Sequence, residues 1–200
     1  HSFPTRRSSD LIQETGNYLF VQASNSLYLY NKNDQSIQTF DKTTGMSDVV
    51  VTNISWNQKA KRLVVVYDNS NIDLIDLQGN VTNVPDLYNK SMTEDKTVNS
   101  IVNNDKYAYI ATNFGGIKLN VASGEVYESY LLGQSIKRFA ISGSTIYALN
   151  TQNKAISASM STNLQDKANW ESTSSYPDGI FNVNNSSYSN NIELVKTLKP

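Results

Sequence analysis

One stretch of this sequence decides the fold: it is LVVVYDNSNIDLI, residues 63–75. An apolar run is followed by a short polar turn and then by a run in which apolar and polar residues alternate. β-branched and aromatic side chains suit half-buried strands, and Asp and Asn suit tight turns. The stretch therefore predicts a β-hairpin.

The same pattern occurs four times in the chain, and its copies begin at Leu19, Leu63, Ala108 and Ile146. A further short apolar strand precedes each of the last three copies, at residues 51–56, 98–102 and 136–141. A turn and a weaker strand follow the first three copies. The repeating unit is therefore four antiparallel strands in roughly 40–45 residues, which is the size of a propeller blade.

A four-stranded sheet with two partly apolar faces cannot bury both of them alone, but sheets stacked around an axis bury each other. We therefore predict an all-β fold, a partial β-propeller of about four four-stranded antiparallel blades, the first of them incomplete. The predicted propeller spans residues 12–175, with blades at residues 12–47, 48–91, 92–134 and 135–175.

Both ends of the chain depart from the repeat. Residues 1–11, HSFPTRRSSDL, have no periodicity and resemble translated sequencing-adapter sequence, so we interpret them as an artefact outside the fold. Residues 176–200 are predicted to be a polar linker or the start of a further blade, in which residues 192–198 could form the first strand.

The composition limits the possible partners. The net charge of −1 gives no general attraction to nucleic acid, and the chain has no Cys for disulfides or thiolate metal sites. No apolar run approaches the ~20 residues that a membrane helix needs. We therefore expect no nucleic-acid partner and no transmembrane segment.

The densest acidic stretch, Asp68–Asp76, does not match a calcium-binding loop, because Asp73 takes the sixth position where such a loop has Gly. We interpret it as a β-turn and a strand whose Asp side chains face solvent. Lys59–Arg62 is predicted to be a charged hairpin turn. Gly115 and Gly116 lack the Lys and the helix of a phosphate-binding loop, so they too indicate a hairpin turn.

The aromatic residues could stack on sugars, but their strand spacing predicts that most of them pack between blades. These residues are Tyr28, Tyr30, Tyr67, Tyr107, Tyr109, Tyr147, Trp56 and Trp170. The glycosylation sequons at Asn53, Asn80 and Asn89 are expected by chance in an Asn-rich chain. No nucleophile and base can be assembled, so we predict no catalytic residues, no bound cofactor, no metal site and no enzyme activity.

Two families resemble parts of the chain. Residues 45–48 (GMSD) and 110–116 (IATNFGG) are similar to motifs in the sensor propellers of two-component regulators. Those propellers have a Trp before the second motif, where this chain has Tyr107 and Ala108. This resemblance implies the alternative function, an extracytoplasmic ligand-sensing propeller.

A closer resemblance, from Tyr18 to Trp170, is to the N-terminal propellers of PorZ-like proteins of the type IX secretion system. It rests on residues 30–36, 41–48, 65–74 and 86–97, of which the last run, DLYNKSMTEDKT, has no role in a generic blade. The resemblance implies a non-catalytic, exported protein in the periplasm or at the outer-membrane surface. Its implied partners are other proteins of the secretion and attachment complex, or lipopolysaccharide glycan. A third possibility is a propeller lyase or glycosidase, which would need convergent acidic or His residues at the channel.

Overall fold

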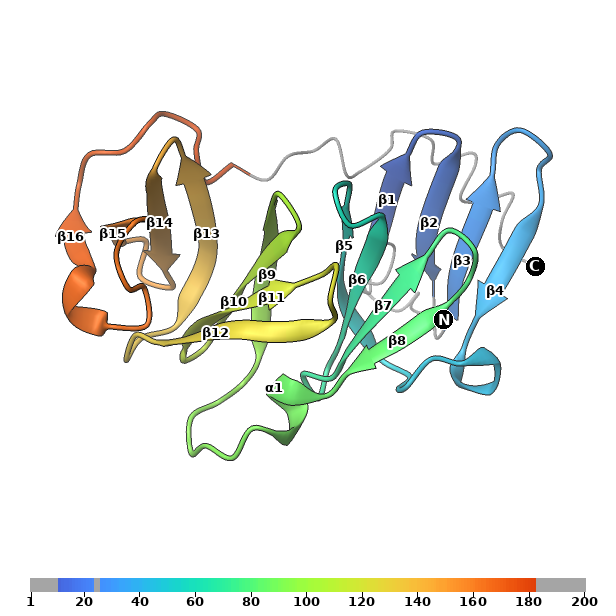
Figure 1. The fold of residues 1–200 in the computed structure, drawn as a ribbon, viewed down its shortest axis with the longest axis horizontal. Coiled ribbons are helices and arrows are strands. Elements are labelled where there is room, and N and C mark those ends of the chain that lie inside the picture. The colour runs from blue at the N-terminus through green and yellow to red at the C-terminus, as the bar shows by residue number, and fades with distance from the viewer. Residues whose placement is uncertain (1–10, 24–25, 183–200) are drawn as a thin grey trace, which may run out of the picture.

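The computed structural model describes residues 11–23 and 26–182. Within these residues, sixteen strands form four four-stranded antiparallel sheets, and in each sheet the strands pair in chain order (Figure 1). The first sheet contains β1 (Leu11–Thr15), β2 (Tyr18–Ala23), β3 (Ser26–Asn31) and β4 (Ile37–Phe40). The second contains β5 (Val51–Asn57), β6 (Arg62–Tyr67), β7 (Ile72–Asp76) and β8 (Val81–Val84).

The third sheet contains β9 (Val98–Asn104), β10 (Tyr107–Thr112), β11 (Gly115–Asn120) and β12 (Glu125–Leu131). The fourth contains β13 (Ile136–Ser142), β14 (Thr145–Asn150), β15 (Ala155–Ser159) and β16 (Glu171–Thr173). Three short helices lie in the described connections: η1 (Lys42–Thr44), α1 (Asp86–Asn89) and η2 (Lys167–Asn169). The predicted fold class, an all-β propeller of about four blades, is confirmed.

The hairpin pattern of the sequence corresponds to the two middle strands of every blade, β2–β3, β6–β7, β10–β11 and β14–β15. The prediction that the first blade is incomplete is wrong, because β1 pairs with β2 from Leu11 opposite Gln22 to Thr15 opposite Tyr18 and completes a four-stranded sheet. Residues 1–10 and the strand predicted at 192–198 lie outside the described residues. The interpretation of residues 1–10 as an artefact therefore stays a prediction, whereas Leu11, assigned to the same segment, belongs to β1.

The core consists of apolar clusters between successive blades, and strand β6 shows how they arise. Leu63, Val65 and Tyr67 belong to the cluster shared with the first blade, whereas Val64 and Val66 belong to the cluster shared with the third. Successive side chains of a strand point to opposite faces. A strand that is covered on both faces therefore needs a continuous apolar run, which is what Leu63–Tyr67 provides.

The blades are arranged so that their first strands are neighbours. Strands β1, β5, β9 and β13 contact one another in that order, and the other strands of each sheet extend away from them. The connection between β8 and β9 carries α1 and projects from one end of the blades (Figure 1). Buried Leu87 anchors this connection to the core. Among the described residues, no helix is long and apolar enough to cross a membrane.

The third and fourth blades approach each other closely at Gly116 in β11. A Cβ atom added there would lie 2.4 Å from Cε2 of Phe139, on the neighbouring blade, and 2.7 Å from the carbonyl oxygen of Ile110. Phe139 is buried and packs edge-on against Tyr130, with ring centroids 6.3 Å apart. The lack of a side chain at residue 116 therefore makes room for the aromatic ring of the next blade.

We expect Gly116→Ala to lower the free energy of unfolding by about 1–3 kcal/mol, because the added methyl group overpacks this junction. The measurement is urea unfolding followed by tryptophan fluorescence. In a Phe139→Leu background the same substitution should cost less, because the ring that it meets has been removed. Strictly additive costs of the two substitutions would show that the ring does not limit residue 116.

Candidate functional site

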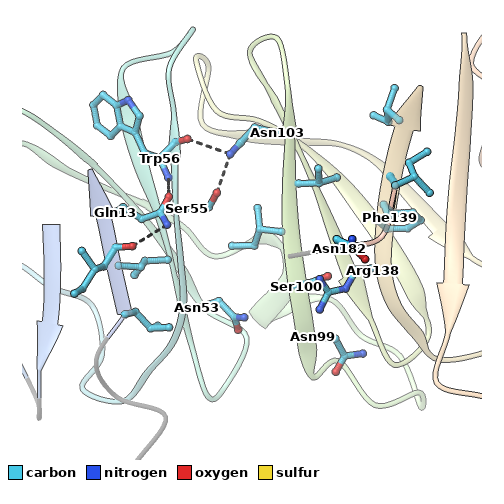
Figure 2. Close-up of a pocket in the computed structure, with 18 of the residues that line it drawn as sticks. Gln13, Asn53, Ser55, Trp56, Asn99, Ser100, Asn103, Arg138, Phe139 and Asn182 are labelled. Atoms are coloured by element: carbon cyan, nitrogen blue, oxygen red, sulfur yellow. Dashed lines mark hydrogen bonds between the residues drawn. The ribbon is translucent and has the colours of Figure 1, made fainter. Parts of the chain in front are cut away.

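A cavity of about 590 Å³ lies along the innermost strands of the four blades. Residues from β1, β5, β9 and β13 and from the segment after β16 line it (Figure 2). Its polar and aromatic lining consists of Gln13, Asn53, Ser55, Trp56, Asn99, Ser100, Asn103, Arg138, Phe139 and Asn182. In a propeller the innermost strands face the axis, so this surface, the channel-side cavity, is where a ligand can reach all four blades.

Polar side chains of the inner strands join the first three blades. The Oε1 atom of Gln13 accepts a hydrogen bond of 3.0 Å from the backbone N–H of Trp56 (Figure 2). The Nδ2 atom of Asn103 donates to Oγ of Ser55, at 2.8 Å, and to the carbonyl oxygen of Trp56, at 3.1 Å. Asn57 in turn donates to Oδ1 of Asn103 at 3.0 Å. These side-chain hydrogen bonds hold the inner strands of neighbouring blades together, because no backbone pairing joins one described sheet to the next.

The junction of the third and fourth blades is held in the same way. Asn99 donates from Nδ2 to Oδ1 of Asn113, at 2.9 Å, and to the carbonyl oxygen of Ile136, at 2.8 Å. The hydroxyl of Ser100 donates to the carbonyl oxygen of Lys137 at 2.8 Å. Much of the polar capacity of the cavity wall is therefore already used between blades.

One group of the wall keeps capacity for other partners. The guanidinium group of Arg138 donates one hydrogen bond, from Nη1 to the carbonyl oxygen of Phe181 at 3.3 Å, and it has further N–H donors. The Oδ1 atom of Asn53 is buried and has no hydrogen-bond partner. Among the described residues that line the cavity, Arg138 carries the one formal charge, and no Asp or Glu lies beside it.

The aromatic rings at this surface belong mainly to the core. Trp56 stacks on Phe20, with ring centroids 5.6 Å apart, and its Nε1 atom donates to Gln58. Phe139 packs against Trp170, whose Nε1 atom donates to the carbonyl oxygen of Leu164. Tyr67, Tyr109 and Trp170 are buried, and Tyr28, Tyr30, Trp56, Tyr107 and Tyr147 are partly exposed. Trp56 is thus the residue of this aromatic set that lines the cavity, and it is partly exposed.

The acidic stretch Asp68–Asp76 differs from its prediction at one residue. The prediction that its Asp side chains face solvent is wrong for Asp73, which is fully buried in β7. The Oδ2 atom of Asp73 accepts hydrogen bonds from the hydroxyl of Tyr67, at 2.5 Å, and from the backbone N–H of Ser47, at 2.7 Å. Its Oδ1 atom accepts from the hydroxyl of Ser47, at 2.6 Å, and from Nδ2 of Asn83, at 3.1 Å.

This carboxylate fastens the connection between the first two blades, because Ser47 lies in the loop from β4 to β5. Burial raises the pKa of Tyr67, and the hydrogen bond to Asp73 adds to that rise. The phenol therefore stays a donor, and four hydrogen-bond donors satisfy the buried carboxyl oxygens of Asp73. The remaining members of the stretch form the β6–β7 turn, in which Ser70 has a positive φ of 68°.

We expect Asp73→Ala to lower the free energy of unfolding by about 2–4 kcal/mol, because it leaves buried donors on Tyr67 and Ser47 without an acceptor. The control is Asp68→Ala, which removes an exposed carboxylate from the same hairpin and should change stability by less than about 0.5 kcal/mol. Chemical unfolding of both variants measures the difference. Equal unfolding midpoints would contradict a structural role for Asp73.

The other predicted features lie away from the cavity. Lys59–Lys61 lies in the β5–β6 hairpin turn as predicted, whereas Arg62 begins β6. Arg62 donates from Nη1 to the carbonyl oxygen of Val121 on the third blade at 3.2 Å. The hairpin turn predicted at Gly115 and Gly116 lies instead at Asn113 and Phe114, and the two glycines begin β11. Gly115 has a φ of 140°, and an added Cβ would lie 2.1 Å from the carbonyl oxygen of Tyr130. Of the sequon residues, Asn53 lines the cavity, whereas Asn80 and Asn89 are exposed.

Sequence reasoning did not identify the wall of the cavity, although it placed three of the four inner strands. The sequence predicts strands at residues 98–102 and 136–141, but it does not single out Asn99, Ser100 or Arg138 as site residues. The sequence does carry one signal for this wall, which is the presence of polar residues within the first strand of each blade. Within the described part of the chain, no group of three His, Cys, Asp or Glu residues could hold a metal ion.

Comparisons with known proteins agree with this architecture. The family model of the PorZ N-terminal β-propeller domain, from the type IX secretion system, matches residues 19–171. The structure of PorZ, an essential bacterial surface component of that system in Porphyromonas gingivalis, is similar with a TM-score of 0.75 and 30% identity. The alignment covers 83% of this chain and 23% of PorZ, so the chain spans about a quarter of that protein.

More distant structures share the fold. The extracellular domain of a one-component system from B. thetaiotaomicron matches 86% of this chain and 23% of its own chain, with a TM-score of 0.62 and 19% identity. AztD from Citrobacter koseri matches 84% of this chain and 46% of its own, with a TM-score of 0.61 and 14% identity. No curated protein sequence matches the chain.

Proposed function

Because this chain belongs to the family of PorZ N-terminal β-propeller domains, we propose that it is a non-catalytic binding module of the type IX secretion system. In this proposal it is exported and acts at the outer-membrane surface, within the complex that attaches secreted proteins. It binds either a protein of that complex or lipopolysaccharide glycan through the channel-side cavity.

The single observation that carries the proposal is the chemistry of the cavity wall. Its side chains are amides and hydroxyls on four rigid strands, with Trp56 and Arg138 among them. Amides and hydroxyls both donate and accept hydrogen bonds, which matches sugar hydroxyls or the backbone of an extended peptide. A small number of convergent polar groups on a fixed scaffold is typical of a binding site.

The same wall does not favour glycoside hydrolysis. That reaction generally uses two carboxyl groups on either side of the bond, roughly 5–9.5 Å apart. The described residues that line the cavity include no Asp or Glu. Asp73 is a buried carboxylate, but it accepts hydrogen bonds from Ser47 and Tyr67 and so connects the first two blades. These contacts support binding as the role of the propeller.

The proposal is tested in the native bacterium by deleting the gene of the full-length protein that contains this propeller. We expect secreted proteins to lose their attachment to the cell surface and to appear in the culture medium. The measurement is the fraction of a known secreted protein in washed cells and in medium. Complementation with the intact gene should restore attachment.

The result also separates the alternative function. A ligand-sensing propeller of a regulator would change transcription on deletion and leave attachment intact in cells that express the secreted protein from an independent promoter. Normal attachment in such cells would overturn the proposal. A control complementation with Lys59→Ala, an exposed residue of the β5–β6 turn away from the cavity, should behave like the intact gene.

A further inference from the structure

The two ends of the blades expose different side chains. Because the strands of each blade are antiparallel and pair in chain order, the turn between the second and third strands lies at the same end as the connection to the next blade. This end, at which α1 projects in Figure 1, is the connection end. It comprises residues 41–50, 68–71, 85–97, 113–114 and 131–135. The opposite end comprises the turns at residues 16–17, 32–36, 58–61, 77–80, 105–106 and 121–124.

The connection end carries exposed apolar side chains in three successive connections. Val49 and Val50 in the β4–β5 connection are 39% and 49% exposed, and Tyr88 in α1 is 48% exposed. Leu131, where β12 leads into the connection to β13, is 51% exposed. The described turns of the opposite end expose no large apolar side chain. Exposed apolar groups that gather on one surface are typical of a protein interface.

The two ends also differ in charge. The connection end contains six Asp and Glu residues and three Lys, whereas the opposite end contains two Asp and four Lys. One of the three Lys, Lys96, donates from Nζ to the carbonyl oxygens of Tyr88, at 2.7 Å, and of Lys90, at 2.9 Å. Its ammonium group is therefore engaged with the backbone of its own connection. The connection end attracts a basic partner and repels an acidic one.

Side-chain hydrogen bonds join the segments of the connection end. Asn71 in the β6–β7 turn donates from Nδ2 to Oδ2 of Asp48, in the β4–β5 connection, at 2.9 Å. The hydroxyl of Ser70 in the same turn donates to the carbonyl oxygen of Lys96, in the β8–β9 connection, at 2.7 Å. A partner that binds here therefore meets a surface whose loops are already held together, which lowers the entropic cost of binding.

A cavity of about 500 Å³ opens beside the β8–β9 connection, and Glu94, Asp95, Leu131 and Lys167 are among the residues that line it. The Nδ2 atom of Asn113 donates to Oδ2 of Asp95 at 2.7 Å, and this hydrogen bond lowers the pKa of Asp95. Asp95 is therefore charged at neutral pH. Among the described residues, no ion pair joins Lys167 to either carboxylate. The cavity thus combines two carboxylates with an exposed apolar side chain.

We propose that the connection end is the docking surface for a protein partner that presents an arginine between apolar side chains. The arginine enters the cavity, where Glu94 and Asp95 face its guanidinium group and Leu131 packs on its aliphatic stem. Tyr88 is the anchor for the flanking apolar groups, since exposed Tyr residues frequently dominate the energy of an interface. The inference goes beyond the proposed function, which concerns the channel-side cavity. It also gives a role to the run DLYNKSMTEDKT, which contains Tyr88, Glu94 and Asp95.

The test is isothermal titration calorimetry of the full-length protein with two capped pentapeptides, Leu-Arg-Leu-Arg-Leu and Leu-Gln-Leu-Gln-Leu. The arginine peptide should bind at least about tenfold more tightly than the glutamine peptide, and added salt should reduce this difference. Glu94→Gln should weaken binding of the arginine peptide by about tenfold and leave the glutamine peptide unaffected. Tyr88→Ala should weaken binding of both peptides, because it removes an apolar contact.

The matched control is Glu125→Gln, which removes the same charge from an exposed position at the start of β12, near the opposite end, and should leave binding unchanged. Thermal unfolding of each variant shows that the fold is kept. Equal affinity for the two peptides, equal losses for the two Gln variants, or no binding of the arginine peptide would overturn the proposal. So would dimerisation of the protein that Tyr88→Ala abolishes, because the occupant would then be a second copy. The attachment assay in cells is independent of these measurements, so the two proposals can fail separately.

Discussion

Each blade of this protein has two apolar faces, and the rest of the structure depends on covering both. The alternation along β6 makes the constraint concrete, because Leu63 and Val65 face one neighbouring blade and Val64 and Val66 face the other. Burial of such side chains is the dominant favourable term in folding. The blades must therefore stack face to face, and this brings their first strands together along one line.

Because the blades stack face to face, polar side chains can lie at only a few positions in the fold. The faces of the blades accept few of them, so hydrogen-bonding side chains gather at the inner strands and in the connections between blades. Asn99 and Asn103 join blades along the inner line, and Asp73 joins a connection to a hairpin. The wall of the cavity is amide-rich because amides both bridge blades and remain neutral, which spares the junctions the desolvation cost of charges.

The sequence reveals those parts of this design that depend on periodicity. The run Leu63–Tyr67 and its three relatives predict the hairpins, because strand faces repeat every two residues. The burial of Asp73 could not be predicted, since periodicity places it on a face but does not say that Tyr67, Ser47 and Asn83 surround it there. The cavity escaped prediction for the same reason. Gln13, Asn53 and Arg138 are far apart in the chain, and only the stacking of blades brings them to one surface.

The arrangement has a consequence for recognition. Strand β13, which carries Arg138, is fixed by its ladder with β14 and by the packing of Phe139 against Tyr130 and Trp170. A side chain on such a strand loses little freedom when a ligand arrives, so the cost of ordering has been met during folding.

The hydrogen bonds between the inner strands serve stability and recognition together, because they hold the blades in register and set the spacing of the groups that a ligand would contact. Arg138 differs from these bridging residues in that most of its hydrogen-bonding capacity is not needed by the fold. A wall that is rigid and whose amides are largely engaged between blades, with free donors left on Arg138, is suited to holding a ligand.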